Sequence, residues 1–196
     1  MILSEGAEAK VYKSKIYGVN IAAKVREPKV YRERSLDTML RESRTKKEAR
    51  AMHSAKTLGV DVPAIVALGR FSIYMECVKG ILLKDAKKAG PEVFERIGSI
   101  LATLHRGNIA HGDFTTANVM LSGSKIYIID FGLAEISGGV EEKAIDLLLM
   151  KRSATAAQYR AFERGYLGNG GRREVLARLA AIMLRGRYQT RTLLTG

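Results

Sequence analysis

The sequence predicts an α+β protein of two lobes, a small strand-rich lobe over residues 1–78 and a reduced, mainly helical lobe over residues 79–196. Two patterns support this fold class. Apolar and polar residues alternate near the start of the chain, as they do in half-buried strands. One long basic stretch in the first lobe, and several stretches in the second, repeat their apolar residues at helical spacing.

The first lobe is predicted to hold a hairpin, a long helix and a further strand. The chain alternates over residues 11–17 and 21–25 with a glycine turn between them, which predicts the hairpin. Small and apolar residues at helical spacing predict a very basic helix over residues 36–58, which Gly59 ends. An apolar run over residues 71–78 predicts the strand.

The second lobe is predicted to begin with an amphipathic helix over residues 91–106. Two short strands, over residues 119–121 and 125–129, then flank a Ser-Gly-Ser turn. We expect further helices over residues 144–151 and 172–184, separated by a glycine-rich stretch.

Composition and charge exclude several classes of protein. The single cysteine, Cys77, rules out a disulfide framework and a cysteine-based zinc site, and it fits a reducing compartment, so we expect a cytoplasmic protein. No apolar run is long enough to cross a bilayer, and we expect neither a membrane partner nor a signal peptide. The net charge of +13 is concentrated toward both ends of the chain, where it would attract phosphates.

The clearest chemical indication comes from two acidic motifs. Asp113 and Asn118 share the loop His-Gly-Asp-Phe-Thr-Thr-Ala-Asn, and Asp130 begins Asp-Phe-Gly at the end of the hairpin that follows. Because the hairpin returns the chain, Asp130 and Asn118 can lie side by side and offer oxygen ligands to Mg²⁺. Since Mg²⁺ combines few protein ligands with phosphate oxygens, the motifs indicate a nucleotide site, with Asp113 as the base or the residue that positions water.

Phosphoryl transfer also needs a cation on the other side of the nucleotide. Lys24 lies on a predicted strand that follows a possible phosphate-covering hairpin over residues 4–11. Lys24 would approach the phosphates there, and a carboxylate on the basic helix would hold it in place. Glu48, well inside the helix, is our choice for that carboxylate, and Glu42 is the alternative.

This order of features resembles the eukaryotic-type protein kinase superfamily. The resemblance implies a bilobal protein-kinase-like fold, ATP and Mg²⁺ as cofactors, and Asp113 and Lys24 as catalytic residues. It also places Gly6 at the second glycine of the nucleotide-covering loop and Val11 at its valine, while Ala9 replaces a later glycine.

The same resemblance implies roles for three residues outside the two acidic motifs. Glu76 and Val78 match the segment that holds adenine through backbone groups, and Asp146 is similar to the buried helix aspartate that braces the catalytic loop. His111 is interpreted as a structural residue that packs beside Phe131 and takes no part in catalysis.

A narrower resemblance covers almost the whole chain. Residues 29–32, 36–37 and 44–50, together with the His-Gly-Asp motif and the basic end at 184–187, are similar to the PRPK-like kinase subunit of the KEOPS (EKC) complex. The resemblance implies an atypical serine/threonine kinase and ATPase, and the compact form suits an archaeal source. It implies as partners a transferase that installs threonylcarbamoyladenosine on tRNA, and the other KEOPS subunits.

Two basic regions are candidates for contact with tRNA, the basic helix and the last segment, residues 172–196. The last segment holds six arginines and one acid, and we expect it to be a flexible arm. For each region the alternative is a solvated surface that binds nothing. The choice between a monomer and a homodimer stays open.

Two absences bear on the reaction. Gly112 replaces the arginine that pairs with a phosphorylated activation loop in regulated kinases, so we expect activity without such phosphorylation. Only residues 133–196 follow the Asp-Phe-Gly motif, without Ala-Pro-Glu, which leaves little chain for a peptide platform. We therefore expect ATP hydrolysis stimulated by the partner and tRNA, with weak kinase activity.

Two other functions are compatible with these motifs. Small-molecule phosphotransferases of the aminoglycoside or choline kinase type also use His-Gly-Asp, although they add helices for which this chain has little room. A non-catalytic scaffold that binds ATP as a structural ligand is the second alternative.

Overall fold

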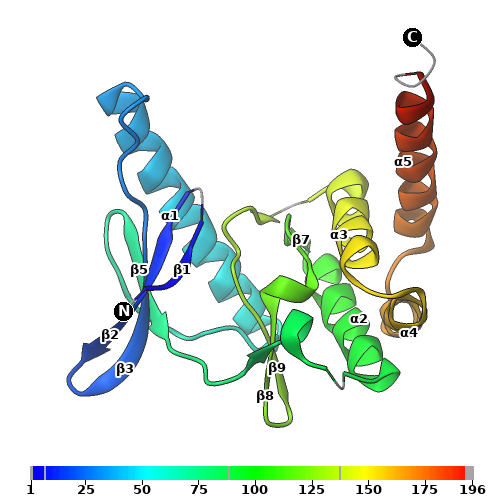
Figure 1. The fold of residues 1–196 in the computed structure, drawn as a ribbon, viewed down its shortest axis with the longest axis horizontal. Helices are drawn as coiled ribbons and strands as arrows, with labels where there is room; N and C mark the ends of the chain where they lie inside the picture. Colours follow the sequence, from blue (N-terminus) through cyan, green and yellow to red (C-terminus); the bar gives the residue numbers. More distant parts are fainter. Residues whose placement is uncertain (1, 7, 88, 137, 193–196) are drawn as a thin grey trace.

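A computed structural model of the chain describes residues 2–6, 8–87, 89–136 and 138–192, with side chains described up to residue 185. Five antiparallel strands form the N-terminal sheet in the order β1-β2-β3-β5-β4 (Figure 1). These strands are β1 (Ile2–Glu5), β2 (Lys10–Ile16), β3 (Val19–Val25), β4 (Ile65–Leu68) and β5 (Ser72–Glu76). The predicted hairpin of β2 and β3 is confirmed, whereas β4 was not predicted, and β5 is shorter than the run over residues 71–78.

Helix α1 (Arg34–Thr57) packs against this sheet and confirms the predicted basic helix. Its buried residues include Thr45, Glu48, Met52 and Ala55, spaced three or four apart, so one face of the helix is covered. The Glu33 carboxylate caps the first turn by accepting backbone N–H groups. Figure 1 shows the first turns of α1 extending beyond the sheet.

The second half of the chain is mainly helical. Strands β6 (Ile81–Leu82), β8 (Val119–Ser122) and β9 (Lys125–Ile128) form one small sheet, and β7 (Ile109–Ala110) pairs with β10 (Glu135–Ile136). The helices are η1 (Leu83–Asp85), α2 (Pro91–Arg106), η2 (Thr116–Asn118), α3 (Val140–Ser153), α4 (Ala156–Gly168) and α5 (Arg173–Thr192). No helix among the described residues is long and apolar enough to cross a membrane.

One hydrophobic core runs through both halves of the molecule. It joins Ala22 and Met75 of the N-terminal sheet to Phe114 in the middle and Phe162 and Leu179 of the C-terminal helices. The boundary between lobes at residue 78 therefore stays a prediction.

Helix α4 corrects the sequence analysis, which expected a glycine-rich connection in its place. The glycines are there because α2 and α4 pack closely enough for backbone to meet backbone. A Cβ at Gly165 would overlap the carbonyl oxygen of Glu95, and a Cβ at Gly98 would overlap that of Phe162. These two glycines reflect helix packing and not a loop. Likewise, α5 continues to Thr192, so the backbone of the segment expected to be a flexible arm is helical as far as that residue.

This packing makes Gly165→Ala a destabilising substitution. We expect it to lower the free energy of unfolding by about 2–3 kcal/mol, because the new methyl group meets backbone that cannot move aside. Gly168→Ala in the same helix is the matched control. Its Cβ meets nothing within 4 Å, so alanine should be neutral or stabilising by up to about 1 kcal/mol. Urea unfolding of both variants checks this, and equal stability of the two would contradict it.

Candidate active site

The centre of the site is a lysine shared by two carboxylates. Lys24 lies on β3, and its Nζ is 2.7 Å from Glu48 Oε1 on α1 and 2.7 Å from Asp130 Oδ1. The second contact joins residues 106 positions apart in the chain. Glu42, the alternative partner, pairs at the surface with Lys46 instead. Of the two candidate carboxylates, Glu48 is therefore the one in contact with Lys24.

Arg26 is a residue of this cluster that the sequence analysis missed. Its Nη2 donates to Glu48 Oε2 at 2.7 Å, and its side chain is 3% exposed. Its Nε and Nη1 atoms are buried without a hydrogen-bond partner in the described part of the chain. Two cations, Lys24 and Arg26, thus face two carboxylates, Glu48 and Asp130, and this pairing offsets the cost of burying charge. The spacing in the sequence could have indicated this position. Arg26 lies two residues after Lys24 in an extended chain, so the two side chains lie on the same face.

Asp130 lies two residues after the end of β9 and adopts an unusual backbone conformation. Its φ is +63°, in the left-handed region that residues other than glycine seldom occupy. Its Oδ1 accepts the Gly132 N–H at 3.2 Å as well as the Lys24 ammonium. Partial burial raises the pKa of the Asp130 carboxyl, but the charge and hydrogen bond of Lys24 outweigh it, so the pKa lies below its ordinary value. Asp130 is therefore an anion at neutral pH.

Asn118 contacts Asp113 through its side chain and the residue before Asp130 through its backbone. The Ile129 N–H donates to the Asn118 carbonyl at 3.0 Å, so the residue before Asp130 contacts Asn118 across the base of the β8–β9 hairpin. The Asn118 Nδ2 donates to the Asp113 carbonyl and to Asp113 Oδ2, both at 2.8 Å. The amide nitrogen is thus used to hold Asp113, and the amide oxygen of Asn118 is the atom left to bind a cation.

The loop that carries Asp113 is held in place by Asp146 on α3. This carboxylate is fully buried, and it accepts the His111 N–H at 2.7 Å and the Gly112 N–H at 2.8 Å. It also lies 3.1 Å from His105 Nε2, whose other ring nitrogen contacts Tyr166 Oη at 2.9 Å. The predicted bracing role of Asp146 is confirmed.

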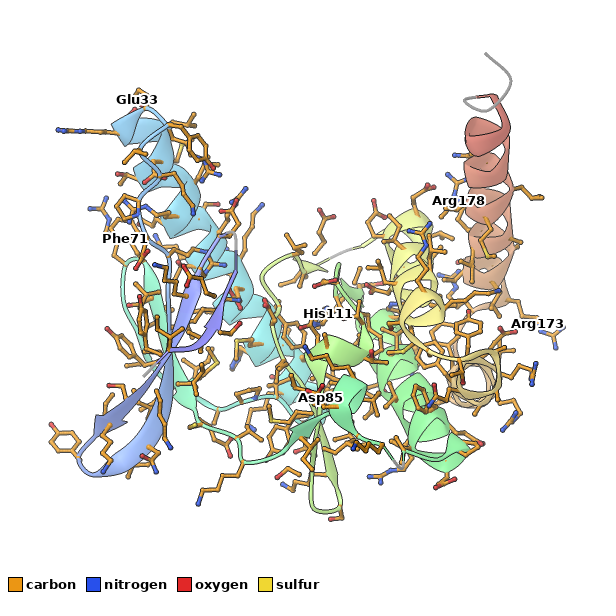
Figure 2. The ribbon with its side chains drawn as sticks, in the orientation of Figure 1. Glu33, Phe71, Asp85, His111, Arg173 and Arg178 are labelled. Atoms are coloured by element: carbon orange, nitrogen blue, oxygen red, sulfur yellow. The ribbon has the colours of Figure 1, made fainter. Side chains whose placement is uncertain are left out.

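His111 is structural, as predicted, and lies near the middle of the molecule (Figure 2). Its ring packs on Phe131 with centroids 4.7 Å apart. Its Nε2 lies 3.1 Å from the Ile129 carbonyl, and its Nδ1 accepts the Asp113 N–H at 3.3 Å. A neutral ring with its proton on Nε2 satisfies both contacts. His111 thereby ties Asp113 to the strand that ends before Asp130.

Gly112 has a conformation that a side chain would disrupt. Its φ is +80°, and a Cβ there would overlap the carbonyl oxygen of Leu133. The arginine that regulated kinases carry at this position would not fit this backbone. The geometry thus supports the expectation that activity does not depend on an arginine bound to a phosphorylated loop.

The buried histidines predict a loss of stability in mild acid. Burial lowers the pKa values of His105 and His111 below 6.5 despite the nearby Asp146. The unfolded chain therefore binds protons first as the pH falls through about 6.5, and the folded state loses stability below that pH. We expect the free energy of unfolding to drop between about pH 7.5 and 5.5 by the order of 1 kcal/mol per buried histidine. Urea titrations should show a smaller drop for His105→Gln and an unchanged drop for the exposed His53→Gln, and the opposite pattern would contradict this assignment.

The residues predicted to hold the adenine and to cover the phosphates lie on the N-terminal sheet or directly beside its strands. The β1–β2 turn is closed by a hydrogen bond from Gly6 N to the Ala9 carbonyl at 3.0 Å. Val11 is the register partner of Lys24, so both side chains lie on one face. Glu76 is the register partner of Ile21 near the start of β3, and Val78 follows Glu76 by two residues. Their contacts with a nucleotide stay a prediction.

Comparison with known proteins identifies the family. The family model described as "RIO domain" matches residues 7–150. The chain is 36% identical to "KEOPS complex subunit Bud32" of Pyrococcus abyssi over 99% of each chain. It is 39% identical to "Probable serine/threonine-protein kinase BUD32 homolog" of Archaeoglobus fulgidus, over 88% of this chain and 90% of that one. The chain belongs to the Bud32 family of RIO-domain atypical kinases. The predicted family is thus confirmed.

Other relatives are much longer than this chain. The chain is 37% identical to the "Probable bifunctional tRNA threonylcarbamoyladenosine biosynthesis protein" of Methanobrevibacter smithii, of which it spans 36%. Among solved structures, the "Rio2 kinase from Chaetomium thermophilum" aligns over 95% of this chain and 73% of that one, with a TM-score of 0.68 and 15% identity. "WaaP in complex with acyl carrier protein" aligns over 98% and 88%, with a TM-score of 0.69 and 17% identity. The kinase-like fold predicted from the motifs is confirmed.

Proposed function

We propose that this Bud32-family chain binds ATP with Mg²⁺ and acts as an atypical serine/threonine kinase and ATPase. The observation that carries the proposal is the position of Lys24, 2.7 Å from both Glu48 and Asp130. Phosphoryl transfer by protein kinases requires such a lysine–glutamate pair beside an aspartate that holds the metal. The chemistry of the donors also fits, since two cations and two oxygen donors converge from separate elements.

Asn118 and Asp130 are the proposed Mg²⁺ ligands. One offers an amide oxygen and the other a half-exposed carboxylate. The described residues contain no cluster of three or more His, Cys, Asp or Glu side chains that could hold a metal, so phosphate oxygens would complete the coordination. When bound, Mg²⁺ would neutralise charge on the phosphates.

Each of the other residues of the site then has its own role in the reaction. Lys24 contacts the phosphates, and Arg26 keeps the other oxygen of Glu48 paired while it does so. Asp113, held by Asn118, accepts the proton of a hydroxyl or orients a water. Residues 6–11 cover the phosphates, with Gly6 and Ala9 at the turn and Val11 beside Lys24, and backbone groups of residues 76–78 contact the adenine.

The names of the relatives suggest the cellular role. We propose that the chain works in the cytoplasm with a threonylcarbamoyl transferase subunit and the other subunits of a KEOPS complex, and supports the modification of tRNA. The basic helices α1 and α5 are the proposed contacts with tRNA, and Figure 1 shows them at opposite ends of the molecule with their outer ends on the same side. The small-molecule phosphotransferase alternative ranks second because the full-length relatives carry Bud32 names.

A phosphate-release assay tests this function. We expect turnover of ATP that rises when the transferase partner and tRNA are added, and loss of turnover in Asp130→Ala. Asp85, exposed on η1, supplies the control Asp85→Ala, which should keep wild-type activity. Binding of ATP without turnover, even with both partners present, would contradict the enzymatic proposal and favour a scaffold.

Removal of the C-terminal segment tests the contact of α5 with tRNA. Deletion of residues 185–196 removes three arginines, of which only Arg185 has a described side chain. We expect weaker tRNA binding and a salt dependence that is shallower by about two to three in log–log slope. Filter binding at several salt concentrations measures both quantities, and an unchanged slope would show that the segment is only solvated.

A further inference from the structure

A small cavity lies where the end of α2, the start of α3 and the connection from α4 to α5 meet, outside the site described above. Arg173, labelled in Figure 2, marks the start of α5. The volume of the cavity is about 10 Å³. A cavity needs about 10–15 Å³ to hold one water molecule, so a single small ligand fills this one.

The lining of the cavity is basic. It includes three cations, Arg106, Lys143 and Arg172, and no carboxylate. Glu174 pairs with Arg172 at the surface, with 2.9 Å between Oε1 and Nε, and balances that one charge. Within the described part of the chain, Arg106 and Lys143 donate only to neutral side-chain oxygens. Two positive charges beside the cavity therefore lack an anion.

Lys143 is the residue that most needs a partner. It is 5% exposed, and its ammonium donates to Asn108 Oδ1 at 3.2 Å, which uses one of its three protons. Burial and the charge of Arg172 lower the pKa of Lys143, and the charge of Glu174 offsets only part of this effect. A buried ammonium is costly unless an anion lies beside it. The cavity is the space in which that anion can lie.

The size and the lining of the cavity define the ligand. A water molecule would leave the charge unbalanced, and a sulfate or phosphate ion is larger than the cavity. Tyr166 and Val175, both fully buried, supply walls of low polarity, where cations attract an anion more strongly than in water. Gly170 leaves room for Arg106, since a Cβ there would lie 3.3 Å from Arg106 Cδ. A single halide ion has the right charge and size.

We propose that this cavity binds one chloride ion, held by the Lys143 ammonium and the Arg106 guanidinium. The ion joins the end of α2 to the start of α3 and to the connection before α5. It stabilises the folded chain, because the cavity does not exist in the unfolded chain. This site goes beyond the proposed function, and neither depends on the other.

Thermal unfolding of the full chain at constant ionic strength tests the site. Potassium chloride replaces potassium gluconate in steps, so the screening of surface charges stays the same. Chloride at about ten times its dissociation constant should raise the folding equilibrium constant about elevenfold. For a chain of this size, that change raises Tm by about 3–6 °C.

Variants separate the site from general effects of the anions. Lys143→Met keeps the length of the side chain without its charge and should lose the chloride response. Lys151→Met, which removes an exposed charge from the same helix, is the matched control and should keep the response. Arg106→Gln should need about two- to fivefold more chloride for the same rise in Tm. A response in Lys143→Met like that of the wild type would overturn the site, as would equal loss in Lys143→Met and Lys151→Met.

Bromide, which resembles chloride in charge and size, locates the ion directly. Crystals of the full chain soaked in sodium bromide should show anomalous scattering beside Lys143 Nζ, and crystals of Lys143→Met should show none there. A water molecule in the cavity of the soaked wild type would overturn the proposal. Bromide in the crystal without a chloride response in solution would mean binding at crystal concentration only and would overturn it too.

Discussion

Phosphate release by the Asp113→Asn variant is expected to be about 10²–10⁴-fold slower than by the wild-type chain. Asparagine keeps the size of the side chain and an oxygen that can accept from Asn118 Nδ2, so the loop should keep its shape. It cannot accept a proton from a hydroxyl or a water, which is the role proposed for Asp113. Nucleotide affinity should change little, because Lys24 and Asp130 are untouched.

Single-turnover assays with the purified chain measure this effect. Asp85→Asn provides a matched control, since Asp85 is exposed and should have no effect. Titration of a fluorescent nucleotide shows whether the site still fills. Turnover like that of the wild type would refute the role of Asp113, whereas loss of nucleotide binding would mean that the residue acts in binding instead.

The Asp146→Ala variant is expected to lose about 3–5 kcal/mol of unfolding free energy. Alanine leaves the His111 and Gly112 N–H groups without their acceptor, and His105 loses a partner in the same place. An unpaired buried donor costs about 1–3 kcal/mol, and these costs accumulate here because the site is closed to water. The catalytic loop should lose its shape, and activity should fall together with stability.

Urea unfolding and phosphate release should be measured on the same preparations. Asp85→Ala, an exposed aspartate, is expected to change stability by less than about 0.5 kcal/mol. Asp113→Asn should lower activity without lowering stability. The comparison therefore separates the chemical role of Asp113 from the structural role of Asp146. An Asp146→Ala protein as stable as the wild type would show that the loop does not depend on this carboxylate.

Features carried by nearby residues were predictable from the sequence. Asp113 and Asn118 are five residues apart, and the hairpin between Asn118 and Asp130 is short, so local geometry alone placed these groups together. The basic helix and the strand that holds Lys24 were also predictable, because their periodicity is a local property. The preference for Glu48 over Glu42 rested only on its position well inside the helix.

Features carried by long-range packing were missed or misread. From the sequence, Gly165 was interpreted as part of a loop. In the structure it lies in α4, where the absence of a side chain allows α4 to approach α2 closely. Arg26 resembled an ordinary basic residue until its burial against Glu48 was seen. The pairing of Glu8 with Arg32 and Arg44 was not predictable either, because both arginines lie far along the chain from Glu8. In each case, the meaning of the residue depends on an element that is distant in sequence.

The amino-acid sequence by itself determined the fold class, the family, and the types of group that the site contains, since these follow from motifs, local spacing and residue chemistry. The tertiary structure alone decided that Lys24 bridges Glu48 and Asp130 and that Arg26 is buried beside them. The physical reason is that burial and charge pairing depend on which elements meet in space, and local periodicity does not contain that information.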